Sequence, residues 1–154
     1  MKSVIVALVV FALFALMAPA TAGEYRLGAL VVGNSWARAT PGVARNGAAY
    51  VTIENRGRDA DRLIAVSSPA AAGAALHSHA MEAGVMKMRP VAAVEVAPGA
   101  VTAMKPGGLH IMLKGLAAPL VEGGSFPLTL TFERAGTLTL EVTVMKIGAR
   151  HGRK

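Results

Sequence analysis

The sequence contains no cysteine. This absence excludes disulfides, thiolate metal ligands and a cysteine nucleophile, so the fold has to rest on its hydrophobic core. Aromatic residues make up only 5% of the chain, too few to form a stacking surface for nucleobases. Acidic residues number 9 against 16 basic ones, and the net charge of +7 comes without any nucleic-acid motif. We therefore expect no nucleic-acid partner.

Long apolar runs are confined to the first 22 residues. Lys2 precedes an unbroken apolar run over residues 4–17, and Ala20 and Ala22 complete an Ala-x-Ala cleavage pattern. This order predicts a signal peptide over residues 1–22 and an exported mature chain. The run is shorter than the roughly 20 residues that a membrane span requires. We expect no stable membrane insertion after signal cleavage.

Several parts of the mature chain alternate between apolar and polar residues. The clearest runs cover residues 49–54, 128–132 and 138–144, and a period of two is typical of strands with one buried face. Turns such as Pro98-Gly99 and Pro106-Gly107-Gly108 separate these runs from further short candidate strands. The pattern predicts an all-β fold, an antiparallel sandwich or Greek-key barrel of roughly seven to nine strands.

We predict a single domain. It covers residues 23–146, and residues 147–154 form a short basic tail. No repeat, low-complexity linker or shift in composition divides the mature chain. The alanine-rich stretch over residues 69–75 is a candidate helical turn, although Gly73 disfavours a helix there.

Histidine and methionine gather in one part of the chain. The cluster comprises His77, His79, Met81, Met86, Met88, Met104, His110 and Met112. Met104 lies beside a turn and is the least suited to a site. Because methionine is a common filler of cores, clustering alone does not distinguish a site from packing.

The position of each residue on its strand is more informative. His110 and Met112 share one face of a predicted strand, whereas the aliphatic residues around them share the other face, which suits a core. Two residues on the same face lie about 7 Å apart. A histidine and a methionine at this spacing can converge on one ion.

A second stretch has the same character. Leu76 is a core candidate, so His77 and His79 project away from the core. After a turn, Met86 and Met88 share a face of the returning strand. A register shift by one residue would instead turn the two methionines into the interior.

Imidazole nitrogen and thioether sulfur form a soft, uncharged ligand set. Such a set suits Cu(I), disfavours magnesium and calcium, and disfavours zinc less sharply. With no thiolate available, a site of two histidines and two methionines favours Cu(I) over Cu(II). From spacing alone, metal binding and simple core packing remain open alternatives.

The spacing resembles a known signature. Ten residues separate His77 from Met88, and twenty-one separate Met88 from His110. One residue separates His110 from Met112. This pattern is similar to that of the periplasmic copper chaperones of the PCu(A)C family. Other segments that resemble this family are Trp36-Ala37-Arg38, Gly47-Ala48-Ala49-Tyr50, Asn55, Gly84-Val85-Met86-Lys87-Met88-Arg89-Pro90, Pro106-Gly107-Gly108-Leu109-His110-Ile111-Met112-Leu113 and Pro127-Leu128-Thr129-Leu130-Thr131-Phe132.

The resemblance covers residues 26–145 and implies a cupredoxin-like β-sandwich in the periplasm. It implies a Cu(I) site near solvent with four ligands, namely His77, Met88, His110 and Met112. It also implies delivery of copper to an acceptor, such as a cytochrome oxidase subunit or another copper chaperone, and we expect the protein to be a monomer. His79 and Met86 are auxiliary candidates outside the four-ligand signature, and the tail retains only His151 as a further ligand.

Three alternatives compete with copper delivery. One keeps the metal but makes the protein a copper storage or tolerance factor, and another is an interaction module in which the cluster is incidental. The third is a copper or zinc enzyme, but the chain has no Gly-x-Ser-x-Gly elbow, no His-Glu-x-x-His motif and no phosphate loop. Near the histidines only Glu82 could supply the carboxylate that zinc hydrolysis usually needs. We therefore predict that the protein is not an enzyme.

Overall fold

The computed structural model describes residues 23–152. The predicted signal peptide and the last two residues of the predicted tail lie outside the described residues. The described chain is built from strands, and no membrane-spanning helix is found in it.

The described residues form eleven strands rather than the seven to nine expected. In chain order they are β1 (Tyr25–Leu27), β2 (Leu30–Arg38), β3 (Asn46–Asn55), β4 (Asp61–Ser67), β5 (Ala71–Glu82), β6 (Val85–Pro90), β7 (Val94–Val96), β8 (Val101–Ala103), β9 (His110–Leu116), β10 (Ser125–Phe132) and β11 (Gly136–Met145). The alanine-rich stretch enters β5 at Ala71 and forms no helical turn.

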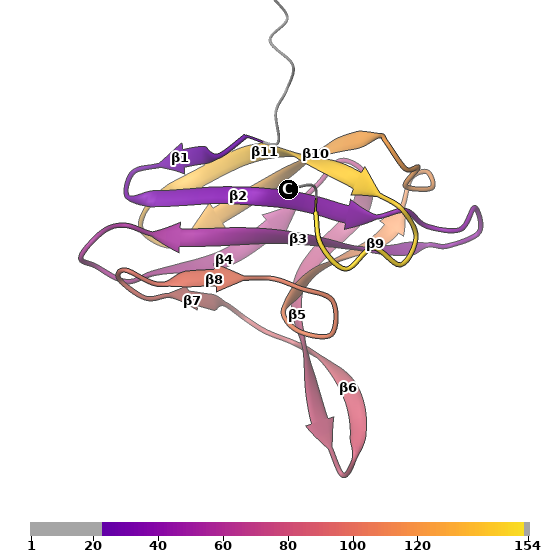
Figure 1. Cartoon of the computed structure of the whole chain (residues 1–154), viewed down its shortest axis with the longest axis horizontal. Helices are drawn as coiled ribbons and strands as arrows, with labels where there is room; N and C mark the ends of the chain where they lie inside the picture. Colours follow the sequence, from indigo (N-terminus) through magenta and orange to yellow (C-terminus); the bar gives the residue numbers. More distant parts are fainter. Residues whose placement is uncertain (1–22, 153–154) are drawn as a thin grey trace, which may run out of the picture.

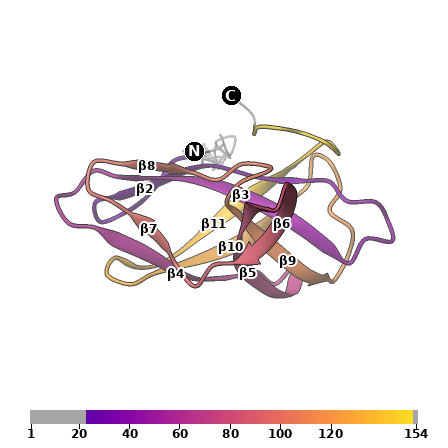
Figure 2. The ribbon, with the colours of Figure 1, turned by 90° about the horizontal axis from the view of Figure 1, so that it is seen from below.

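The strands hydrogen-bond in the order β6-β5-β9-β3-β2-β11-β10-β4-β7, with β1 beside β2 and β8 beside β3. Neighbours run antiparallel except for β2 and β11, which are parallel. The curved sheet folds over into two layers, with β2, β3 and β8 along one side and β4 and β7 along the other (Figures 1 and 2). The predicted all-β, cupredoxin-like sandwich is confirmed, with one parallel pair in an otherwise antiparallel arrangement.

The space between the layers holds the core. Along β10 every second residue is buried, from Phe126 to Phe132, and the intervening threonines are partly exposed. In β3 the same alternation buries Val51 and Ile53 completely. Because the period-two pattern places one face of each strand in the core, the other face of β3 and β9 remains free to carry a site.

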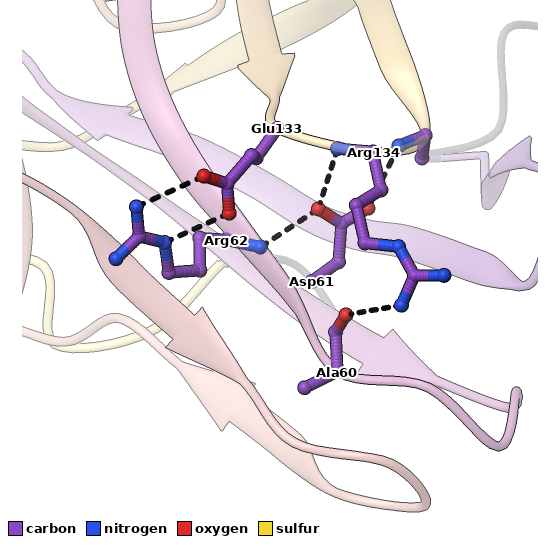
Figure 3. A network of polar contacts seen from close by, with 6 residues as sticks. Ala60, Asp61, Arg62, Glu133 and Arg134 are labelled. Carbon is purple, nitrogen blue, oxygen red and sulfur yellow. Dashed lines mark hydrogen bonds and ion pairs between the residues drawn. The ribbon is translucent and has the colours of Figure 1, made fainter.

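Asp61 is a buried carboxylate at the start of β4. It accepts hydrogen bonds from the backbone N–H groups of Arg62 (2.8 Å), Arg134 (2.9 Å) and Ala135 (2.8 Å) (Figure 3). Beside it, Arg62 forms an ion pair with Glu133 at 2.9 Å. These contacts fasten β4 to the turn between β10 and β11.

The described part of the predicted tail packs on β2. Ala149 is buried, and its carbonyl accepts a hydrogen bond from Arg38 Nε at 2.6 Å. Gly152 lies so close to the indole of Trp36 that an added Cβ would be 2.9 Å from its Cδ1. The C-terminal segment thereby covers the outer face of the sheet near β2 and β3.

Candidate metal centre

Three neighbouring strands carry the predicted ligands. In the register between β5 and β9, His77 lies opposite His110. In the register between β5 and β6, His79 lies opposite Met88. Residues that lie opposite each other project to the same face of a sheet, and so do residues two apart on one strand. His77, His79, Met88 and His110 therefore project to one face.

The core occupies the opposite face of these strands. Leu76 and Ile111 lie opposite each other and are both buried among the core residues. As predicted, the histidines point away from this aliphatic layer. They are nevertheless well covered, since His110 is 3% exposed and His77 is 8% exposed.

Met112 has small neighbours on both sides. It lies opposite Ala48 of β3 and opposite Ala75 of β5. Because alanine ends at Cβ, the long methionine side chain has room beside His110. The same face of β3 continues to Tyr50, whose ring stacks on Trp36 with centroids 4.4 Å apart.

A cavity of about 340 Å³, open to solvent, lies over this face. Its lining consists of Arg38, Thr40, Asn46, Gly47, Ala48, Tyr50, His79, Met88, Pro106, Gly107, His110 and Met112. Two thioethers and two imidazoles thus converge on one hollow. No carboxylate is among these lining residues.

The three imidazoles are in contact. The rings of His79 and His110 stack with centroids 5.1 Å apart and planes 28° apart. The rings of His77 and His110 meet edge to face, with centroids 5.9 Å apart. His77 is therefore next to the cavity, on the inner side of His110, although it does not line it.

The ring nitrogens have unequal partners. Nδ1 of His110 lies 2.9 Å from the carbonyl oxygen of Gly108. A carbonyl only accepts, so His110 donates from Nδ1 and keeps the lone pair of Nε2 free for a ligand. Nδ1 of His77 and Nδ1 of His79 are buried and have no hydrogen-bond partner. Buried polar atoms normally have partners, so these two nitrogens point to a missing ligand.

Burial favours the neutral form of the inner imidazoles. Burial lowers the pKa of His77, and the nearby charges of Lys114 and His110 lower it further. Burial also lowers the pKa of His110, helped by His79 and opposed by the hydrogen bond to Gly108. Metal ions bind the neutral imidazole, so both histidines are prepared to bind without first losing a proton.

Burial also acts on Tyr50 in the cavity wall. It raises the pKa of this phenol, while the charge of Arg38 opposes the rise. The wall thus combines a neutral phenol with one permanent cation. Within residues 23–152, no three His, Cys, Asp or Glu side chains are placed to hold an ion by themselves. A metal centre in this cavity therefore requires methionine sulfur.

The structure brings together three of the four predicted ligands, Met88, His110 and Met112, and adds His79 from the auxiliary candidates. Met86 does not line the cavity and is 55% exposed. Met104 is buried in the core, as expected for the methionine least suited to a site.

Sequence reasoning did not identify the polar wall of the cavity. Arg38, Asn46 and Tyr50 belong to strands whose function could not be inferred from alternation alone. Their only signal was that Arg38 and Tyr50 fall in segments that resemble the PCu(A)C family. The pairing of β3 with β9, between residues more than 60 positions apart, brings this wall next to the ligands.

Comparisons with known proteins agree with this geometry. The LpqE-like family, described as "Putative lipoprotein LpqE-like", matches residues 30–144. A curated relative from Leifsonia xyli subsp. xyli, "Putative lipoprotein Lxx21020", is 32% identical over 98 residues, which is 63% of this chain. The match spans only 59% of that relative's length.

Two solved structures are similar over most of the chain. The copper-bound PCuAC domain from PmoF2 has a TM-score of 0.70 and 27% identity, covering 80% of this chain and 98% of that domain. The solution structure of CuI-DR1885 from Deinococcus radiodurans has a TM-score of 0.56 and 29% identity, covering 80% of this chain and 81% of that one. The family match and these neighbours confirm the resemblance seen in the sequence: the chain belongs to the LpqE-like family, and its domain is of the PCu(A)C type.

Proposed function

We propose that this protein binds Cu(I) and passes it to an acceptor protein. The ligands are Met88, His110 and Met112 in the cavity, together with His77 on the inner side of His110. His79 lies at the outer side of the same group. The observation that carries the proposal is the convergence of two thioethers and two imidazoles on one hollow, together with two buried ring nitrogens, on His77 and His79, that lack partners.

The donor set favours the monovalent ion. Thioether and imidazole are soft, uncharged ligands that suit Cu(I) better than magnesium, calcium or zinc. The lining supplies the cation of Arg38 and no carboxylate. A fixed positive charge repels a divalent ion about twice as strongly as a monovalent one at the same distance. Both features disfavour Cu(II) relative to Cu(I), and the similar structure of CuI-DR1885 is named for the Cu(I) form.

The open cavity suits exchange rather than storage. Its neutral ligands leave Cu(I) with its single positive charge. Because the cavity is open to solvent, an acceptor's ligands can replace them one at a time. A monomer working in the periplasm after export over residues 1–22 could in this way supply a cytochrome oxidase subunit or another copper chaperone. Catalysis plays no part in this proposal.

Competition with a Cu(I) chelator under reducing, anaerobic conditions tests the site. The parent should bind one Cu(I) tightly, and the double variant His110→Ala with Met112→Leu should lose this affinity. The matched control is Met145→Leu, which removes a methionine from β11, a strand that contributes nothing to the cavity lining. Equal affinity of the double variant and the parent would refute the assignment.

A deletion strain separates delivery from storage or tolerance. Delivery predicts low cytochrome oxidase activity when copper is scarce, restored by the parent gene but not by the double variant. Storage or tolerance predicts normal oxidase activity at low copper and poor growth when copper is in excess.

A further inference from the structure

The hairpin of β5 and β6 projects away from the body of the molecule (Figure 1). All six residues of β6 are exposed, and β6 is an edge strand whose neighbour is β5. A hairpin with both faces in water has no need of large apolar side chains. Three methionines are nevertheless exposed on it, Met81 by 64%, Met86 by 55% and Met88 by 42%.

The two faces of this hairpin differ in chemistry. Glu82, Lys87 and Arg89 lie on one face, where the carboxylate of Glu82 pairs with Lys87 at 3.3 Å and with Arg89. The other face carries soft ligands from both strands. Met81 lies opposite Met86, and His79 lies opposite Met88. Core packing does not explain this sorting, because the hairpin extends beyond the core.

These pairs form successive rungs of one ladder. The outer rung is Met81 with Met86, and the next is His79 with Met88. The inner rung is His77, which lies opposite His110 across β9. Successive rungs are about 7 Å apart along the strands, and opposite residues have Cβ atoms about 5 Å apart. Long thioether side chains can therefore meet within a rung and reach toward the next.

We infer that Met81 and Met86 form a second, weaker Cu(I) site through which the ion enters and leaves the cavity. This inference rests on the proposed function. Two thioethers suffice to hold Cu(I) weakly, and their exposure lets a donor or acceptor reach the ion. His79 and Met88 receive the ion next. At each step one Cu–ligand bond forms as another breaks, so the metal remains Cu(I) and no electron is exchanged.

The test uses the variant Met81→Leu with Met86→Leu. Leucine keeps the apolar volume and removes only the sulfur, so the exposed hairpin should fold as before. The matched control is Val85→Leu, an exposed residue on the charged face of the same hairpin. Two measurements are made on the full mature chain: methionine methyl NMR during titration with Cu(I), and stopped-flow transfer of Cu(I) to bathocuproine disulfonate.

We expect the first equivalent of Cu(I) to shift the methyl signals of Met88 and Met112. The second equivalent should shift those of Met81 and Met86. The double variant should bind the first equivalent as tightly as the parent but release it about tenfold more slowly, which is about 1.4 kcal/mol in activation free energy. Val85→Leu should match the parent in both measurements.

Two results would overturn the inference while leaving copper binding intact. One is release from the double variant at the parent rate. The other is a second equivalent that leaves the Met81 and Met86 methyl signals unmoved. Failure of the parent to bind even the first equivalent would instead refute the proposed function, and the ladder with it.

Discussion

Within residues 23–152, the polar cluster around Asp61 and the cluster of histidines are built on opposite principles. At the start of β4, the carboxylate of Asp61 accepts hydrogen bonds from three backbone N–H groups, so both of its oxygens have a partner. On β5 and β9, His77, His79 and His110 lie together in contact, and two of their buried nitrogens have no partner. Asp61 and His77 are both buried, at 6% and 8% exposed, so solvent does not account for the difference between them, whereas His79 lines the open cavity.

The contrast separates structural from functional polarity. A buried polar group with partners stabilises a fold modestly, whereas one without partners costs about 1–3 kcal/mol. The carboxylate of Asp61 holds a turn in place, and both of its oxygens are occupied by hydrogen bonds. The histidines keep lone pairs available at a cost in stability, which is the arrangement expected where a ligand supplies the missing bonds. Substitutions in the two clusters should therefore change the free energy of unfolding in opposite directions and by different amounts.

The largest effect should come from Asp61→Ala. This change removes a buried carboxylate and leaves three part-buried backbone N–H groups without their acceptor, and we expect the free energy of unfolding to fall by about 3–5 kcal/mol. Urea denaturation of the apoprotein measures it. The control is Asp59→Ala, which removes only an exposed carboxylate 3.5 Å from Arg134; we expect a loss below about 0.5 kcal/mol. Similar losses in both variants would show that Asp61 is not special.

The same cluster predicts a pH dependence. Burial of the Asp61 carboxyl raises its pKa, but the hydrogen bonds from Arg134, Arg62 and Ala135 and the charge of Arg134 outweigh burial and lower the pKa overall. A carboxyl group with a lowered folded-state pKa stabilises the fold fully above its unfolded pKa of about 3.9. This stabilisation is lost as the pH falls through the folded pKa. Asp61→Asn should flatten the acid limb of a stability profile below about pH 4, and an unchanged limb would contradict the assignment.

A smaller effect should distinguish the two neighbouring histidines. His77→Ala removes one of four proposed ligands, and we expect Cu(I) affinity to fall about 100-fold, or about 2.8 kcal/mol. His79→Ala removes an imidazole from the outer side of the site, and we expect a loss of affinity below about threefold. Chelator competition on both variants measures the ratio. If His79→Ala had the larger effect, His79 rather than His77 would be the ligand.

His77 and His79 show what the sequence alone can predict of the site. Period-two alternation predicts that His77 and His79 share a face, and that Leu76 faces the core. It cannot say that His79 lies opposite Met88 while His77 lies opposite His110, because these registers depend on turn geometry and on pairing with β9, more than 30 residues away. Nor does it predict that the C-terminal segment packs on β2 over Trp36, because this contact joins residues more than 100 positions apart.

The next prediction reverses the sign found at Asp61. His77→Leu replaces a buried imidazole that lacks a partner with an apolar side chain of similar size. Removal of an unsatisfied polar group leaves the stability of the apoprotein unchanged or raises it by about 1 kcal/mol, while Cu(I) affinity falls about 100-fold, as in His77→Ala. Asp61→Leu is the matching change in the other cluster and should be strongly destabilising. Equal destabilisation by the two leucine variants would mean that His77 has a partner in solution.

The smallest effect concerns the turn between β5 and β6, next to the outer pair Met81 and Met86. Ala83 and Gly84 connect β5 to β6 with φ of 49° and 78°, so both adopt the left-handed conformation of a two-residue hairpin turn. Alanine is disfavoured there and asparagine is tolerated, so Ala83→Asn should stabilise the hairpin by about 0.5 kcal/mol. The gain should appear as slower amide exchange within β5 and β6 and not as a change in global unfolding, because an edge hairpin opens on its own. Gly84→Ala should act in the opposite direction, and unchanged exchange in both variants would show that the turn does not limit hairpin opening. Since neither residue supplies a ligand, Cu(I) affinity should remain that of the parent in both.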